Sequence, residues 1–206
     1  MIIKVCGMRE TENIRAIESL GIVDLMGFVF YERSPRYVGK RPDYLPEQCR
    51  RVGVFVNERI GTALSRVWEF GLHAVQLHGR ETPEECLSLR DEGLTVIKAF
   101  SIGNKDDLRS TLQYEGKCDY YLFDTACTTY GGSGRRFDWS LLRHYRGQTP
   151  FLLSGGLCPE SLPDVQAFHH SLLAGIDLNS GFETSPGIKD ADQLNEFISN
   201  IKKEAL

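Results

Sequence analysis

Short apolar segments recur along the whole chain at nearly regular intervals, and this recurrence constrains the fold more than any other feature. Eight segments are rich in Val, Ile, Leu and Phe and alternate little with polar residues, as expected of strands covered on both faces of a parallel sheet. Corresponding positions lie 21 to 31 residues apart, which accommodates one strand, one helix and two short loops. The predicted strands are Ile2–Cys6, Leu25–Phe30, Val52–Asn57, Ala74–His78, Thr95–Ser101, Asp119–Thr125, Phe151–Ser154 and Ala174–Asn179.

The segments between these strands carry helical signals of unequal strength. Thr11–Leu20 places isoleucine and leucine on one face before a glycine, and Asp190–Lys203 is clearly amphipathic. A third helix begins at Thr82 with a cap, a proline and two acidic residues, and it ends before a glycine. Pro42–Arg51 and Trp139–Tyr145 are short, so we expect only weak helices there.

Eight strand–helix units that begin with a strand predict one α/β domain over residues 1–206, a single (β/α)₈ TIM barrel. The 206 residues lie near the lower limit of about 200 for this fold, so the loops must be short. An open doubly wound sheet would have fewer strands or a nucleotide-binding fingerprint. Neither GxGxxG nor GxxxxGK[ST] follows a predicted strand.

Composition excludes several classes of function. The net charge of −4 lacks the basic excess of a nucleic-acid-binding protein, and no apolar run approaches the roughly 18 residues of a membrane span. The six cysteines form no CxxC pair, and the amino terminus does not resemble a signal peptide, so we expect reduced thiols and a cytoplasmic location. The five histidines show no metal-ligand spacing, and no exposed apolar stripe stands out, so we expect no metal and possibly a monomer.

The active site of such a barrel lies at the carboxyl ends of the strands, often with phosphate held by the loops after strands seven and eight. Gly155 and Gly156 follow the seventh strand, and Leu157–Glu160 then begins a helix. Ser180 and Gly181 follow the eighth strand. Glycine lets backbone amides approach an anion closely. Two tight turns are the alternative explanation, but their adjacent positions favour a phosphate site.

Cys6 ends the first predicted strand and is the candidate general base. A thiol with an ordinary pKa near 8.5 is only a few per cent ionised at neutral pH, so a working base needs a stabilised thiolate. Lys4 lies two residues earlier on the same face of the strand, and we expect its ammonium, or donors on the substrate, to assist. An equally supported alternative is that this lysine anchors the barrel floor.

Asp124 ends the sixth strand and is the candidate general acid, because desolvation there would favour the protonated form. The alternative is a carboxylate that caps the following loop through neighbouring amides, and the pairing with Cys6 from a different strand favours the acid. Arg36 lies in a proline-containing loop after the second strand that could aim its guanidinium at a carboxylate. His78 ends the fourth strand and is a candidate for lining the site, as is Asp177 in the eighth. Gly132 belongs to a glycine-rich loop, residues 130–134, which is either a connector or a lid.

In order along the chain, the residues resemble one family closely, phosphoribosylanthranilate isomerase of tryptophan biosynthesis. The matching motifs are Lys4-Val5-Cys6-Gly7, Gly27-Phe28-Val29-Phe30, Ser34-Pro35-Arg36, Val52-Gly53-Val54-Phe55, Ala74-Val75-Gln76-Leu77-His78-Gly79, Asp124, Gly131-Gly132-Ser133-Gly134, Phe137-Asp138-Trp139, Leu153-Ser154-Gly155-Gly156-Leu157, Pro159-Glu160, Asn179-Ser180-Gly181, Glu183, Pro186-Gly187 and Lys189-Asp190.

This resemblance implies an Amadori rearrangement of N-(5-phosphoribosyl)anthranilate to 1-(2-carboxyphenylamino)-1-deoxyribulose 5-phosphate without a cofactor. It assigns protonation of the furanose ring oxygen to Asp124 and removal of the C2 proton to Cys6. Arg36 would hold the anthranilate carboxylate, and the two glycine turns would hold the phosphate. The expected partner is therefore a small phosphorylated molecule.

Two alternatives remain open. The histidine-pathway isomerase performs the same rearrangement in a barrel, but that family uses two aspartates and has a half-barrel repeat. Cys6 and the absence of an obvious repeat argue against it. A catalytically silent metabolite-binding barrel is disfavoured by the joint presence of Cys6, Asp124 and Arg36.

Overall fold

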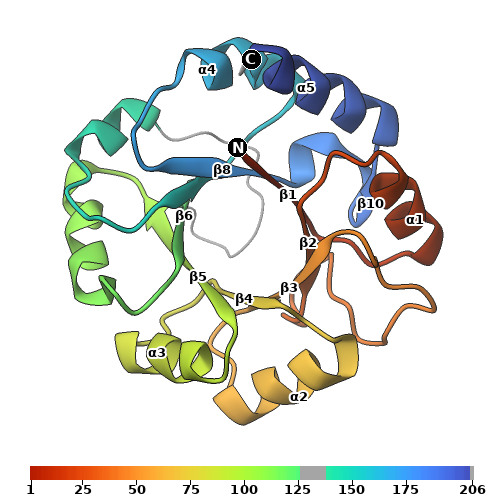
Figure 1. Ribbon diagram of the computed structural model, residues 1–206, viewed down its shortest axis with the longest axis horizontal. Coiled ribbons are helices and arrows are strands. Elements are labelled where there is room, and N and C mark those ends of the chain that lie inside the picture. Colours follow the sequence, from red (N-terminus) through yellow and green to blue (C-terminus); the bar gives the residue numbers. More distant parts are fainter. Residues whose placement is uncertain (126–137, 205–206) are drawn as a thin grey trace.

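Eight parallel strands close into a barrel that helices surround on the outside in the computed structural model, which describes residues 1–125 and 138–204 (Figure 1). Each strand pairs with the next along the chain, and β1 pairs with β8 to close the ring. The strands are β1 (Ile2–Cys6), β2 (Leu25–Val29), β3 (Arg50–Phe55), β4 (Ala74–Leu77), β5 (Thr95–Ile102), β6 (Tyr120–Thr125), β7 (Phe151–Leu153) and β8 (Leu173–Leu178). The predicted (β/α)₈ barrel is confirmed, and every strand boundary lies within two residues of its predicted position.

Within the described residues, four connections between barrel strands contain an α-helix and a fifth α-helix follows β8, and most of the strong helix predictions are confirmed. These are α1 (Thr11–Ser19), α2 (Ile60–Phe70), α3 (Pro83–Asp91), α4 (Leu162–Ala167) and α5 (Ala191–Glu204). At the start of α3, the Thr82 hydroxyl accepts from the Glu85 amide at 3.2 Å, and the Glu85 carboxylate accepts from the Thr82 amide at 2.7 Å. This reciprocal capping box is the helix start that the sequence indicated.

The connection between β2 and β3 contains no helix, so the prediction of a weak helix at Pro42–Arg51 is wrong. Two prolines interrupt this segment, and a side chain of α1 replaces the helical hydrogen bonds. The buried Glu18 carboxylate accepts from the amides of Gln48 and Cys49 at 2.6 and 3.3 Å, and from the Tyr44 hydroxyl. The loop is therefore held by one carboxylate rather than by a backbone ladder.

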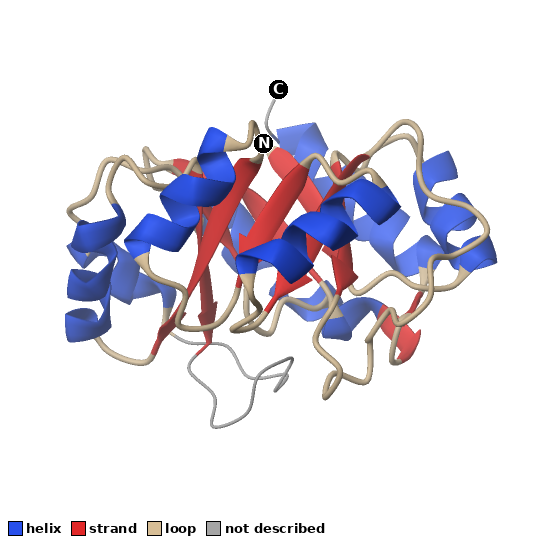
Figure 2. Ribbon diagram, turned by 90° about the horizontal axis from the view of Figure 1, so that it is seen from below, coloured by secondary structure: helices blue, strands red, loops and turns tan. Residues whose placement is uncertain are grey.

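The remaining short elements are 3₁₀ turns and one small hairpin. The weak helix predicted at Trp139–Tyr145 is a 3₁₀ helix instead, η2 (Trp139–His144). The others are η1 (Lys105–Tyr114), η3 (Pro159–Ser161) and η4 (Ser180–Phe182), followed by the two-stranded sheet of β9 (Glu183–Ser185) and β10 (Ile188–Lys189). Figure 2 shows β9 and β10 at the end of the barrel opposite the two termini.

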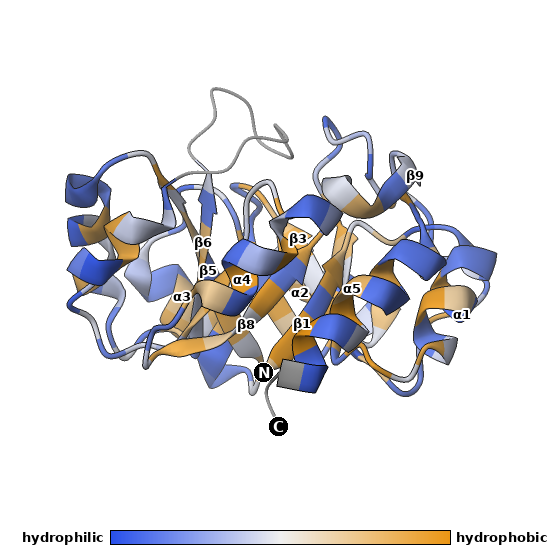
Figure 3. Ribbon diagram, turned by 90° about the horizontal axis from the view of Figure 1, so that it is seen from above, coloured by the Kyte–Doolittle hydropathy of each residue, from blue (hydrophilic) through white to orange (hydrophobic). Residues whose placement is uncertain are grey.

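Side chains alternate between two apolar layers along each strand. In β1, Ile3 and Val5 join the large cluster between barrel and helices, whereas Cys6 joins a separate cluster inside the ring. Apolar colour follows the strands while the outer helix faces are hydrophilic (Figure 3). A layer of seven side chains fills the barrel interior: Leu25, Val52, Ala74, Ile97, Ala99, Leu122 and Leu152. Within the described ranges, no helix is long and apolar enough to cross a bilayer.

Candidate active site

Cys6 and Asp124 both lie at the carboxyl ends of their strands, β1 and β6. The Cys6 side chain is buried inside the ring, where Val29 and Val54 pack with it. Gly27 on the neighbouring strand leaves room for the thiol, since a Cβ there would lie 2.8 Å from Sγ. Cys6 therefore lies on the inner face of the barrel at the carboxyl end of β1.

Charges below and beside Cys6 act on its thiol in opposite directions. Burial raises the pKa of Cys6, and so does the negative charge of Asp177, whereas the ammonium groups of Lys4 and Lys189 lower it by a smaller amount. The expectation that Lys4 favours the thiolate is correct in sign, but burial outweighs it, so the unliganded thiol is not a stabilised thiolate. A raised pKa makes the thiolate scarcer and also a stronger base once formed.

Lys4 and Asp177 form an ion pair inside the barrel, directly below Cys6. The Lys4 Nζ lies 2.8 Å from Asp177 Oδ1, and both side chains are buried. Although burial acts to lower it, the Asp177 charge holds the pKa of Lys4 above its ordinary value. Ser154 Oγ donates to the second Asp177 oxygen at 3.5 Å, and this carboxylate also interacts electrostatically with Asp124 and His78. Asp177 thus interacts electrostatically both with the groups around the candidate base and with those around the candidate acid.

Asp124 is held from two sides. Its Oδ1 accepts from the Thr125 amide at 2.7 Å, and its Oδ2 lies 3.3 Å from His78 Nε2. The other ring nitrogen, Nδ1, lies 3.0 Å from Gln76 Nε2. Because an amide nitrogen only donates, Nδ1 acts as acceptor and Nε2 carries the proton toward Asp124. The structure brings His78 and Asp124 together, a contact that sequence analysis did not anticipate.

Arg36 aims its guanidinium at a carboxylate, as its loop suggested, but in this structure that carboxylate is Glu183 on β9. Arg36 Nε donates to the two Glu183 oxygens at 2.8 and 3.1 Å, and Nη2 donates to Oε2 at 2.6 Å. The buried Lys189 ammonium also contacts Glu183, and it donates to Asn179 at 2.8 Å. The Arg36 stem runs over Gly7, where a Cβ would lie 2.6 Å from Arg36 Cδ. Arg36 is therefore fixed beside the end of β1.

The loops after β7 and β8 meet. Gly155 and Gly156 have φ of 84° and 69°, in the left-handed region that favours glycine. A Cβ on Gly155 would lie 2.7 Å from Asp124 Oδ1, so this turn lies against the candidate acid. A Cβ on Gly181 would lie 2.9 Å from the Cys158 Cα, so the turn after β8 packs against the residues that directly follow the Gly155-Gly156 turn. The predicted adjacency of the two loops is confirmed, whereas phosphate binding by them and by Ser180 stays a prediction.

The partners that hold the site residues in place could not be recognised from the sequence. Glu183, Lys189 and Gln76 appeared only as parts of motifs, with no role assigned to them. A polar or charged residue inside an otherwise apolar strand, such as Lys4 in β1 or Gln76 in β4, is the one signal that could have indicated buried polar pairs. Gly132 and the loop of residues 130–134 lie outside the described residues. No cluster of three or more potential metal ligands is found in residues 1–125 and 138–204.

Comparison with known proteins yields consistent matches. Residues 3–200 match the family model described as N-(5'-phosphoribosyl)anthranilate (PRA) isomerase. The N-(5'-phosphoribosyl)anthranilate isomerase of Phocaeicola vulgatus is 61% identical over 204 residues, covering 99% of each chain.

Solved structures agree with these sequence matches. The phosphoribosyl anthranilate isomerase of Thermus thermophilus has a TM-score of 0.82 and 28% identity, covering 98% of this chain and 99% of that one. A second phosphoribosyl anthranilate isomerase was crystallised with reduced 1-(o-carboxyphenylamino)-1-deoxyribulose 5-phosphate. It has a TM-score of 0.77 and 34% identity, and the match covers 98% of this chain and 100% of that one.

Proposed function

The chain belongs to the N-(5'-phosphoribosyl)anthranilate isomerase family of tryptophan biosynthesis, and we propose that Cys6 is its general base and Asp124 its general acid. The observation that carries this proposal is the placement of a thiol and a carboxyl group at the carboxyl ends of β1 and β6 in one closed barrel. Asp177 interacts electrostatically with both groups. Such a pair can move two protons on a single bound substrate.

The proposed reaction is an Amadori rearrangement in three steps. In its protonated form, the Asp124 carboxyl group donates a proton to the furanose ring oxygen, and the bond from that oxygen to C1 breaks. The anthranilate nitrogen keeps its own proton and forms a protonated imine to C1. The Cys6 thiolate then removes the proton on C2, and the electron pair moves through C1 to nitrogen to give an enolamine. Tautomerisation of the enolamine gives the ketose. No redox change of the protein is involved, and these side chains supply the proton transfers.

We place the substrate between the Arg36 loop and the two glycine turns. Glu183 occupies the Nε/Nη2 edge of Arg36, so Arg36 would recognise the anthranilate carboxylate through the second edge of its guanidinium, formed by Nη1 and the other Nη2 hydrogen. The backbone around Gly155, Gly156 and Gly181, with the Ser180 hydroxyl, would bind the phosphate. The product analogue in the related crystal structure carries both a carboxylate and a phosphate, which supports this division.

We also propose that residues 1–206 form one catalytic domain that acts in the cytoplasm on a small phosphorylated substrate. The five described cysteines are free, in keeping with reduced thiols. A monomeric state remains the simplest proposal, and sedimentation of the purified protein tests it.

Turnover of N-(5-phosphoribosyl)anthranilate by the purified protein, followed as loss of anthranilate fluorescence, tests the assignment. General acid–base catalysis contributes about 10²–10⁴-fold, so Cys6→Ala and Asp124→Asn should each lower kcat by a factor in that range. Cys49→Ala and Asp119→Asn are matched controls, because Cys49 is a buried cysteine of the loop before β3 and Asp119 precedes β6 at its opposite end. Full activity in either site variant would disprove the assigned role.

A further inference from the structure

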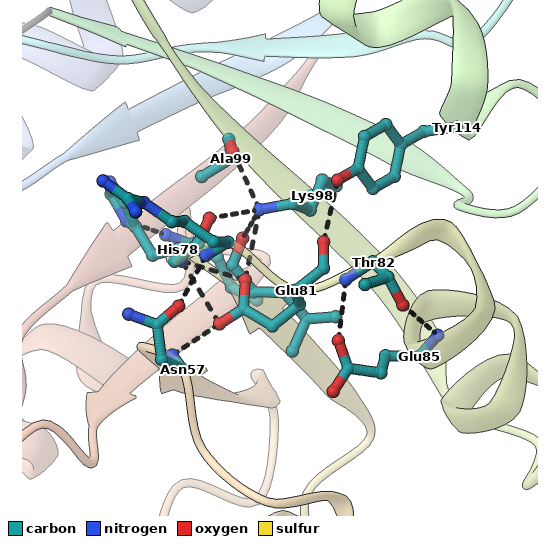
Figure 4. A network of polar contacts seen from close by, with 12 residues as sticks. Asn57, His78, Glu81, Thr82, Glu85, Lys98, Ala99 and Tyr114 are labelled. Atoms are coloured by element: carbon teal, nitrogen blue, oxygen red, sulfur yellow. Dashed lines mark hydrogen bonds and ion pairs between the residues drawn. The ribbon is translucent and has the colours of Figure 1, made fainter.

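Lys98 and Glu81 are two buried charged side chains that the proposed reaction does not use. Lys98 lies in β5 between two residues of the interior layer, so its side chain points outward, toward the segment before α3 (Figure 4). Its Nζ lies 3.1 Å from Glu81 Oε2. A buried ion pair often contributes no net stability compared with apolar side chains, so its presence calls for another explanation.

The Lys98 ammonium binds the backbone on both sides of His78. It donates to the carbonyl oxygen of Leu77 at 3.1 Å and to that of Gly79 at 2.8 Å, the residues directly before and after the histidine. It also donates to the carbonyl oxygen of Ala99 on its own strand at 3.2 Å. Lys98 therefore holds the peptide group that leads into His78, through the Leu77 carbonyl, and the carbonyl one peptide group beyond the histidine, through Gly79.

The Glu81 carboxylate binds further backbone groups next to His78. It accepts from the Gly79 amide at 2.9 Å and from the Asn57 amide, after β3, at 2.7 Å. Gly79 has no room for a side chain, since a Cβ would lie 2.6 Å from the Asn57 amide and 2.7 Å from Glu81 Oε1. The amide of His78 itself donates to the Phe55 carbonyl at 2.8 Å. The ends of β3, β4 and β5 are thus joined around the histidine.

We infer that the Lys98–Glu81 pair is a positioning device that holds the His78 ring in place against Asp124. The pair contacts only the backbone around His78, and the His78 ring then donates through Nε2 to the Asp124 carboxylate. This inference rests on the proposed role of Asp124 as general acid. A displaced ring would leave the acid badly oriented, so the pair should influence kcat more than KM.

A double-mutant cycle tests this inference. Glu81→Gln keeps an acceptor for the two amides but removes the charge, and we expect it to lower kcat about 10- to 100-fold with KM changed less than about threefold. His78→Ala should lower kcat by a similar factor, and Glu81→Gln should have almost no further effect in that background. Leu89→Ala, which truncates a buried side chain within α3, controls for lost stability. Effects of Glu81→Gln and His78→Ala that multiply would overturn the inference.

Nitrogen NMR of the imidazole provides a readout that does not depend on turnover. In the wild-type protein the ¹⁵N shifts of His78 should report a single tautomer protonated at Nε2, and in Glu81→Gln they should move toward the average of both tautomers. A wild-type ring that already samples both tautomers would contradict the inference even if no variant folds. If Glu81→Gln leaves an unpaired ammonium that prevents folding, Lys98→Met/Glu81→Gln removes both charges and takes its place in the cycle. Absence of turnover in the wild type would reject the proposed function, whereas unchanged His78 shifts in a folded variant would reject only the positioning role.

Discussion

Replacing Gly155 by alanine should damage catalysis through Asp124 and not only through the turn. An added Cβ would lie 2.6 Å from the Thr125 amide and 2.7 Å from Asp124 Oδ1, and closer still to the Thr125 hydroxyl. Ordinary contact begins near 3.4 Å, so the end of β6 must move by about 0.7–0.8 Å. Misplacement by about 1 Å can cost about 10²-fold in rate, and we therefore expect Gly155→Ala to lower kcat about 30- to 100-fold.

Gly93 offers a matched control. Its φ of 82° nearly equals the 84° of Gly155, but no atom lies within 4 Å of the added Cβ. Alanine at either position is strained by about 1–2 kcal/mol in the left-handed region. Only Gly155→Ala adds overpacking of about 1–3 kcal/mol.

Thermal unfolding and steady-state kinetics on the two variants separate these contributions. In a chain of this size, about 1 kcal/mol shifts Tm by about 2–4 °C, so we expect a fall of about 2–8 °C for Gly93→Ala and about 4–20 °C for Gly155→Ala. Turnover is followed as loss of anthranilate fluorescence below both unfolding transitions. Equal kcat values for the two variants would refute the argument that Gly155 leaves space for Asp124.

Three further predictions follow from the contacts around Cys6 and Glu183. Glu183→Gln should destabilise the protein by about 3–5 kcal/mol near neutral pH, because it leaves buried cations without their carboxylate. Burial by itself would raise the pKa of Glu183, but Arg36 and Lys189 hold it below the ordinary 4.5. The stabilisation is therefore present above pH 4.5 and lost as the pH falls through the lowered pKa, so a Tm difference from wild type that does not shrink in acid would contradict it. Lys4→Met removes a positive charge that lowers the pKa of Cys6, so alkylation of Cys6 should require a higher pH than in the wild type. Mass spectrometry of the alkylated protein maps the reaction to Cys6. An unchanged pH dependence of alkylation would count against this role of Lys4. Gly27→Ala should displace the thiol, because its Cβ would lie 2.8 Å from Sγ, and we expect kcat to fall at least about tenfold in the fluorescence assay.

Several features of the fold followed from local patterns in the chain. The strands consist mostly of apolar residues because both of their faces are covered, and this signal needs no knowledge of the neighbouring strands. The capping box at Thr82 is equally local, since both of its partners lie within three residues. The failed prediction at Pro42–Arg51 shows the limit of such signals. That loop is stabilised by Glu18, whose partners lie up to 31 residues away.

In the candidate site, too, some features could be predicted from the sequence and others could not. Cys6, Asp124 and the two glycine turns could be identified from sequence, because a parallel barrel brings every strand's carboxyl end to one face. That geometry follows once the strands are counted, whatever their side chains. The positions of the proposed base, acid and phosphate loops were therefore predictable, and their electrostatics were not.

The sequence alone determined the number of strands, the closed barrel and the set of residues at its carboxyl end, because these depend on short-range periodicity. Only the tertiary structure decided which charges meet: Lys4 with Asp177, 173 residues apart, and Arg36 with Glu183, 147 residues apart. Burial and pairing of an ionisable group depend on the atoms that surround it after closure, and no local pattern encodes a partner at that separation. For the same reason, the upward shift in the pKa of Cys6 could be determined only in the folded barrel.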